Sequence, residues 1–200
     1  MPVTVDHEPM KTDELGLRTV GQVLSHLKKA NRLVVNVVID GQAPDLNRMA
    51  DLRQRIVGEH TIFIETAEPK TMALEILQQV EAQLGLADQL KSEATELLRK
   101  NQNVKALEKL SGCFATWQNA QQSLLGTAQL LKIDLDEIFV SNRKLSDVLG
   151  DVTDQLKQIK SALENRDFVS LSDLLIYETT QTTSQWQEAV VALRQQIQIQ

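Results

Sequence analysis

The chain has 200 residues, of which 42% are hydrophobic and 24% are charged, a composition typical of a soluble globular protein and too apolar for global disorder. No run of residues approaches the roughly 18 to 20 apolar positions of a membrane-spanning helix, so no membrane partner is expected. A formal net charge of -6, with few aromatic side chains and none interleaved with basic ones, argues against nucleic acid as a partner.

Residues 1–15 are predicted to be disordered or to form a short strand. The first ten carry Asp6 and Glu8 and lack the basic start and apolar stretch of a signal peptide. The single cysteine, Cys113, allows no intrachain disulfide, which fits a reducing compartment. We therefore expect a cytoplasmic protein.

Residues 16–68 are predicted to form a small α/β unit of two or three strands. The β-branched runs at 33–39 and 61–66 are typical of strands, apolar periodicity over 20–27 predicts a helix, and Asp45 can cap a second helix between the two strands. The order strand, helix, strand can form a right-handed crossover with a parallel pair of strands, and the sequence leaves open whether the strands are parallel. Because two strands hide little surface, the unit should recruit the N-terminal strand or dock on the following helices, and docking is favoured.

Residues 69–200 are predicted to form an antiparallel bundle of about five helices, because apolar residues recur there every three or four positions. The predicted helices span 71–84, 87–99, 104–131, 147–163 and 168–197. The third and the last are each about 40 Å long at 1.5 Å per residue. Caps are expected in the breaks at 101–103 and 165–167. The spacing in 145–163 is that of the seam of a bundle or of a short coiled coil. The predicted fold class is α+β, mainly α.

No residue pattern predicts catalysis, a cofactor or a metal site, so the protein is expected not to be an enzyme. The histidines are His7, His26 and His60, and none has a second His or a Cys at a ligand spacing. Cys113 falls beside an apolar stripe, where it is expected to pack in the core. The loop at 40–45 is interpreted as a strand-to-helix turn. The alternatives there are an anion site or a magnesium ion held by Asp40 and Asp45.

Five residues of the long predicted helices are candidates for an interface or a polar layer. Trp117 and Trp186 are either interface anchors or core residues, since large aromatic side chains dominate both settings. Glu178 and Thr182 fall on a face that should be apolar, and Gln121 lies within the stripe of the other long helix. These three either form a buried polar layer that fixes helix register or lines a pocket, or they are exposed to solvent.

The combination of a small α/β piece at 33–66 with a helical region that contains DFVSLSDLLIYE at 167–178 resembles a group of uncharacterised bacterial proteins. The helical half is similar in outline to flagellar and type III export chaperones, whose antiparallel helices sheathe an amphipathic segment of a partner. The resemblance implies a bacterial protein. Because no catalytic constellation appears and the two long helices outrun the shorter helices beside them, we expect a scaffold or chaperone-like interaction protein that binds a partner helix or forms a homodimer through its long helices. The alternative is a small-molecule sensor or unrecognised enzyme built around Glu178.

Overall fold

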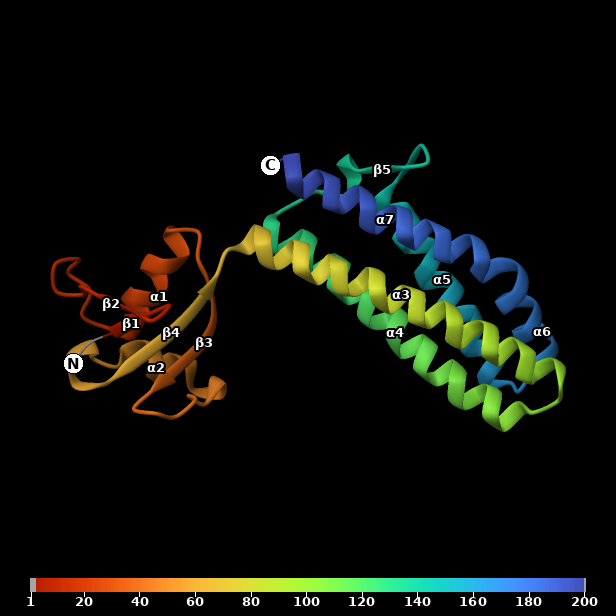
Figure 1. Cartoon of the computed structure of the whole chain (residues 1–200), viewed down its shortest axis with the longest axis horizontal. Helices are drawn as coiled ribbons and strands as arrows, with labels where there is room; N and C mark the ends of the chain where they lie inside the picture. Colours follow the sequence, from red (N-terminus) through yellow and green to blue (C-terminus); the bar gives the residue numbers. More distant parts are fainter. Residues whose placement is uncertain (1–2, 200) are drawn as a thin grey trace. The chain divides into compact units, whose positions relative to one another are not determined.

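The computed structural model describes residues 3–199, and within them every side chain except those of residues 46 and 178–182. The chain divides into two compact units, Met1–Met72 and Ala73–Gln200 (Figure 1). Each unit has its own hydrophobic core. The architecture is α+β and mainly helical, as predicted.

The N-terminal unit is a four-stranded sheet in the order β2-β1-β4-β3. Its elements are β1 (Val3–Val5), β2 (Glu8–Met10), α1 (Val20–Lys29), β3 (Leu33–Ile39), a 3-10 turn (Leu46–Arg48), α2 (Met49–Gln54), a second 3-10 turn (Val57–Glu59) and β4 (Ile62–Ala67). β1 pairs antiparallel with β2 and parallel with β4, and β4 pairs antiparallel with β3. A hairpin, a helix and two further strands joined in this order form the β-grasp topology, which by itself does not fix a function.

The two strands predicted at 33–39 and 61–66 do not form the parallel pair that a crossover would give. β3 and β4 are antiparallel, and the parallel partner of β4 is β1 at the N-terminus. The segment between β3 and β4 contains the six-residue α2 and two 3-10 turns, and it returns the chain antiparallel to β3. The unit therefore recruits the N-terminal strand, the alternative that the sequence did not favour.

Helix α1 covers one face of this sheet. It begins with a capping box in which the Thr19 hydroxyl accepts from the Gln22 N–H and the Gln22 side chain accepts from the Thr19 N–H. Its buried residues Val20, Val23 and Leu27 pack into a core shared with the sheet. The apolar periodicity that predicted this helix is therefore the set of residues that attaches it to the strands.

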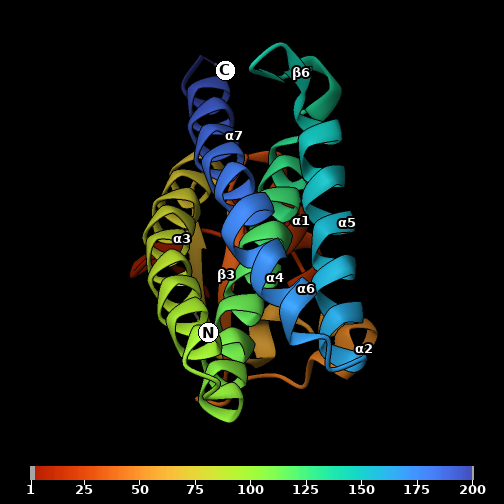
Figure 2. The same ribbon diagram turned by 90° about the vertical axis from the view of Figure 1, so that its right-hand side faces the viewer.

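The C-terminal unit is an antiparallel bundle (Figure 2). Its helices are α3 (Pro69–Arg99), α4 (Asn103–Leu131), α5 (Leu145–Glu164), α6 (Phe168–Asp173), a π-helical turn (Leu174–Glu178) and α7 (Thr179–Ile199). The predicted helices 71–84 and 87–99 are one continuous helix, α3. Gly85 does not break it, because a single glycine in a helix costs only about 1 kcal/mol.

The connections between these helices are built from local turns. Asn101 and Arg166 adopt left-handed backbone conformations that end α3 and α5, and Asp167 caps α6 by accepting from the Ser170 N–H at 3.0 Å. The connection at 132–144 contains a 3-10 turn (Leu135–Glu137) and the short hairpin β5 (Phe139–Val140) and β6 (Arg143–Lys144). Three of its apolar residues, Ile133, Ile138 and Val140, are buried in the bundle core beside the shorter α5.

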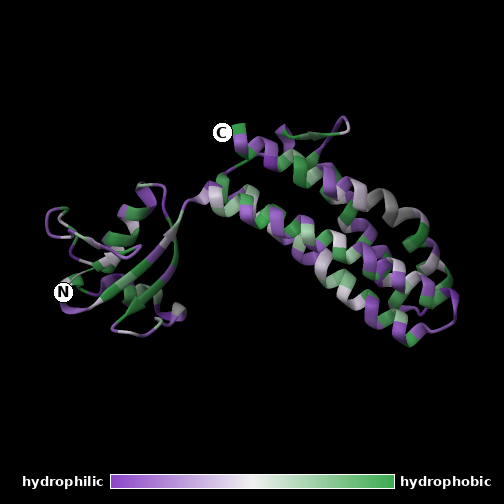
Figure 3. Cartoon of the chain, viewed as in Figure 1, coloured by the Kyte–Doolittle hydropathy of each residue, from purple (hydrophilic) through white to green (hydrophobic). Residues whose placement is uncertain are grey.

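Hydrophobic and hydrophilic residues alternate along the helices of the bundle (Figure 3). The buried positions form one continuous core from α3 to α7. The long helices therefore satisfy most of their apolar faces against each other within one chain.

Candidate functional site

The two tryptophans lie in the core of the bundle. Trp186 on α7 is 1% exposed and Trp117 on α4 is 5% exposed. The Trp117 ring packs against Phe114 with the ring centres 5.7 Å apart, and its indole N–H has no hydrogen-bond partner among the described residues. Both side chains therefore pack within the bundle.

Gln121 of the predicted polar layer joins two helices. Its side-chain amide donates to the Thr153 hydroxyl at 2.6 Å, and that hydroxyl donates to the Leu149 carbonyl at 2.9 Å, which links α4 to α5. The side chains of Glu178 and Thr182 lie outside the described residues. The structure therefore places Gln121 alone of these three, in a half-buried polar contact.

A buried polar cluster lies elsewhere, between α3 and α7. The Lys91 ammonium is 2.9 Å from the Asp88 carboxylate and 3.5 Å from the Thr183 hydroxyl, which donates to Asp88 at 3.0 Å. Lys91 is 8% exposed and Thr183 is 5% exposed. A sequence signal for this cluster exists, because Lys91 follows Ala87 by four positions and precedes Ala94 by three, on the apolar stripe of α3.

The π-helical turn explains why Thr183 faces inward. A π turn contains one residue more than an α turn, so every later residue is rotated by about 100° from the α-helical expectation. The apolar spacing in the sequence places Thr182 on the buried face only if the helix is α-helical throughout, and the π-helical turn breaks that condition. An open groove of about 630 Å³ lies beside this turn, lined by residues of the cluster and by Ser92, Thr95, Arg99 and Gln187.

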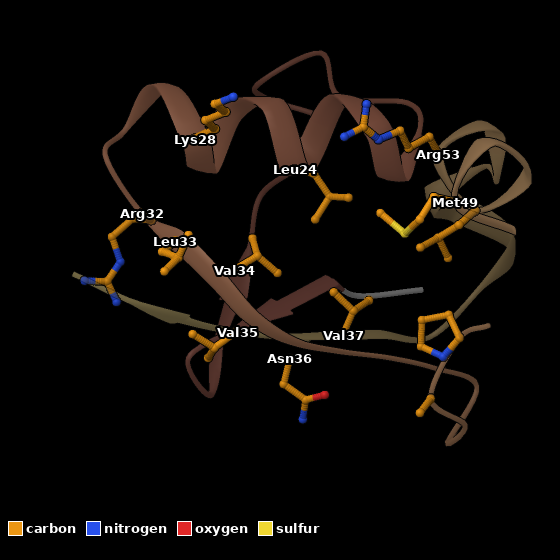
Figure 4. Close-up of a pocket in the computed structure, with 13 residues that line it drawn as sticks. Leu24, Lys28, Arg32, Leu33, Val34, Val35, Asn36, Val37, Met49 and Arg53 are labelled. Carbon is orange, nitrogen blue, oxygen red and sulfur yellow. The ribbon is translucent and has the colours of Figure 1, made fainter. Parts of the chain in front are cut away.

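A second concavity, of about 550 Å³, lies in the N-terminal unit along the free edge of β3 (Figure 4). Its apolar lining comes from α1, β3, the following loop and α2: Leu24, Leu33, Val34, Val35, Val37, Ala43, Pro44, Met49 and Leu52. β3 is the last strand of the sheet, so only one of its edges is paired. We call this concavity the β3 groove.

The ladder between β3 and β4 shows which backbone groups of β3 face the open edge. The Asp40 N–H donates to the Thr61 carbonyl at 2.9 Å, so Asp40 and Thr61 are a hydrogen-bonded pair of the ladder. Hydrogen-bonded and non-hydrogen-bonded pairs alternate along an antiparallel ladder. The backbone N–H and carbonyl groups of Ile39 and Val37 therefore point away from β4, toward the open edge. Ile39 exchanges two hydrogen bonds with Gln42. The N–H and carbonyl of Val37 have no partner in the part of the chain that the structure describes.

Two irregularities limit the open stretch of this edge. A register shift between Val34 and Asn36 interrupts the ladder on one side of Val37, and the Ile39–Gln42 bridge ends it on the other. Bulges are a common device that limits edge-to-edge pairing. A short segment therefore fits beside β3 better than a long strand.

The groove is stabilised at one end by Asp6. The Asp6 carboxylate accepts from the Thr66 N–H at 2.7 Å and from the Arg32 guanidinium at 3.0 Å. Hydrogen bonds from the Thr66 hydroxyl and N–H, with a smaller contribution from Arg32, lower the pKa of Asp6 below its usual 3.8. This contact holds Arg32 beside the start of β3.

The loop at 40–45 uses its carboxylates locally. Asp40 accepts from the Thr61 N–H at 2.9 Å and lies 2.7 Å from Nδ1 of His60, and these contacts lower its pKa. Asp45 caps the first 3-10 turn through the Asn47 N–H, as predicted. Within residues 3–199 the described side chains form no cluster of three or more metal-ligating residues.

Cys113 packs in the bundle core, as expected. Its thiol donates to the Ala87 carbonyl at 3.3 Å, and burial raises its pKa to about 12.

None of the helices that the structure describes combines the length and apolar character needed to cross a bilayer. The chain is therefore a two-unit α+β protein with an edge-strand groove in one unit and a buried polar cluster in the other.

A family model described as "Domain of unknown function (DUF8042)" matches residues 75–189, more than half of the chain. The chain belongs to this family. The match covers the helical unit and stops short of the N-terminal sheet. Neither the curated proteins nor the solved structures contain a significant match.

Proposed function

We propose that the protein is a non-enzymatic interaction protein, and that its N-terminal unit binds a short extended segment of a partner protein beside β3. The supporting observation is the coincidence of an edge strand, an outward-facing backbone pair at Val37 and an apolar groove. An extended segment added to a sheet edge gains main-chain hydrogen bonds, while pockets for alternate side chains supply specificity.

This proposal modifies the expectation that the long helices bind the partner. Their apolar faces, including Trp117 and Trp186, are largely buried within the bundle. The β3 groove instead keeps apolar surface open next to unpaired backbone. In this proposal the bundle is a scaffold that carries the binding unit, and the protein acts in the cytoplasm of a bacterial cell.

The test begins with selection of binders from a displayed library of random twelve-residue peptides on the full chain. The selected peptides are titrated into the isotope-labelled protein, and amide NMR signals are followed. We expect the largest shifts at residues 33–37 and at Leu24 and Met49, which line the groove. Peptides that bind but leave β3 unperturbed would contradict the proposal.

A blocking variant and a matched control sharpen the result. Ala43 is an exposed loop residue that lines the groove, whereas Ala50 is exposed on α2 and does not line it. Ala43→Trp should fill the groove without disturbing the core and should weaken peptide binding strongly, while Ala50→Trp should leave binding unchanged. Equal binding by both variants would place the site elsewhere.

A second candidate function is small-molecule binding beside the π-helical turn. The observation that favours it is the nearly buried Lys91 at the base of an open polar groove, since π turns occur frequently at functional sites. Mass spectrometry of small molecules retained by the native protein would test it. Retention that is lost in Lys91→Met but kept in Lys100→Met, an exposed lysine of the same segment, would support this function.

A further inference from the structure

The charged residues that line the β3 groove are all cationic. They are Lys28 at the end of α1, Arg32 before β3 and Arg53 on α2 (Figure 4). No carboxylate is among the described residues that line it. The remaining polar side chain is that of Asn36, which hydrogen-bonds Glu65 at 3.0 Å.

Two of these three cations are available to a ligand. Arg32 is paired with Asp6 at 3.0 Å and also donates to the Thr66 hydroxyl. Lys28 and Arg53 are exposed, and neither forms an ion pair with any residue that the structure describes. They belong to different helices, α1 and α2, and Leu24 and Met49 line the groove between them.

The close approach of these two helices positions Arg53. Gly21 on α1 lies against α2, and a Cβ at Gly21 would be 2.9 Å from the Arg53 carbonyl oxygen. The Val20 N–H also donates to the Arg55 carbonyl at 3.0 Å, which fixes the end of α2 against the start of α1. Arg53 is thus held at the rim by backbone contacts.

From this arrangement we infer that the segment bound beside β3 has an apolar centre flanked by carboxylates, an inference that rests on the proposed function. The apolar centre packs on Leu24, Val37 and Met49, and acidic residues on either side reach Lys28 and Arg53. Because little backbone is exposed for pairing, side-chain contacts and charge contribute most of the selectivity.

The same charges argue against a second copy of this chain as the occupant. Pairing of two β3 edges would bring two cationic rims together, and like charges across an interface are unfavourable. An acidic segment would instead place opposite charges next to the cationic rim, which is favourable. The occupant is therefore a different, acidic segment.

The inference is tested with three synthetic peptides that share a core of four alternating valine and isoleucine residues. Their flanks carry two glutamates, two glutamines or two lysines on each side. Affinity for the full chain is measured at low and at physiological salt. We expect the glutamate peptide to bind about tenfold more tightly than the glutamine peptide at low salt, with the lysine peptide weakest and the difference reduced by salt.

A charge variant locates the effect. Lys28→Gln combined with Arg53→Gln should remove the preference for glutamate, whereas Lys29→Gln combined with Arg48→Gln should retain it, because neither of the latter residues lines the groove. Lys28 and Lys29 both lie in the last turn of α1, so their effects on helix stability are matched.

The outcomes separate this inference from the proposed function. The inference would be overturned by equal affinities for the three peptides, or by a preference for glutamate that survives in the Lys28 and Arg53 variant. Library peptides that bind at β3 would still support the proposed function in either case. If no library or synthetic peptide binds, both fail. A dimer of the chain that Ala43→Trp abolishes would overturn the inference by making a second copy the occupant.

Discussion

The partly buried ion pair between Asp88 and Lys91 should respond asymmetrically to removal of its two charges. The Lys91 side chain is 10% exposed, whereas that of Asp88 is 33% exposed. Removing one member of a fully buried pair costs about 3 to 5 kcal/mol, because the other charge is left uncompensated. Asp88→Asn leaves the more buried charge, that of Lys91, without its counter-ion. We expect this substitution to lower the free energy of unfolding by about 2 to 3 kcal/mol.

The opposite substitution should be milder. Lys91→Met leaves a carboxylate that still reaches water and still accepts from Thr183, while the desolvation penalty of the ammonium disappears. We expect a cost of about 1 kcal/mol or less, and the double variant should lie within about 1 kcal/mol of the parent protein. The coupling energy in this cycle measures the interaction directly.

Urea unfolding followed by tryptophan fluorescence is a suitable assay. The chain has two tryptophans, Trp117 and Trp186, and both lie in the helical unit, so the signal reports on that unit alone. The pair formed by Lys157 and Asp154 has the same spacing and is 71% exposed on both sides, and Asp154→Asn should cost less than about 0.5 kcal/mol. If Lys91→Met costs as much as Asp88→Asn, the argument from unequal burial is wrong.

Three further predictions concern single residues. The Cys113 thiol, with its pKa raised to about 12 by burial, should not react with a disulfide reagent at pH 8 until urea unfolds the bundle, and fast labelling of the native protein would contradict its placement. Gly21→Ala should destabilise the N-terminal unit and weaken peptide binding, because the new Cβ meets the backbone of Arg53, as NMR-monitored denaturation would show, whereas unchanged stability would refute the close approach. Since the pKa of Asp6 is lowered in the folded state, chiefly by its hydrogen bonds with Thr66, its contribution is fully present above pH 3.8 and is lost as the pH falls through the folded pKa. Asp6→Asn should flatten this acid dependence in the amide signals of β4, and an unchanged pH profile would count against the contact.

Much of the local structure could be predicted from the sequence. The periodic apolar residues predicted α1, α4 and α5 closely, and short side chains at helix starts predicted the caps at Asp45 and Asp167. The cap expected at 101–103 is wrong, because Gln102 precedes α4 without a side-chain hydrogen bond. These features depend on contacts within a few residues, so the chain needs no information from elsewhere to specify them.

The candidate sites could be predicted from the sequence only in part. Lys91 stands on an apolar stripe where its charge, and that of its partner Asp88 three residues earlier, are visible in the sequence. The sequence does not show that Thr183, on a helix distant in the chain, completes the cluster by donating to Asp88 and contacting Lys91. The π-helical turn changed which residue faces it, and the short apolar periodicity there does not distinguish a π turn from an α turn.

The sequence by itself determined where α1, α4, α5, β3 and β4 form, since propensity, periodicity and capping act within a few residues. Only the tertiary structure decided that β4 lies between β1 and β3, that β3 is left as an edge strand, and that cations from α1 and α2 meet beside it. Strand pairing and groove formation depend on which distant segments bury their apolar surface together. The same local pattern is compatible with several such pairings, and the choice between them is made by packing of the whole unit.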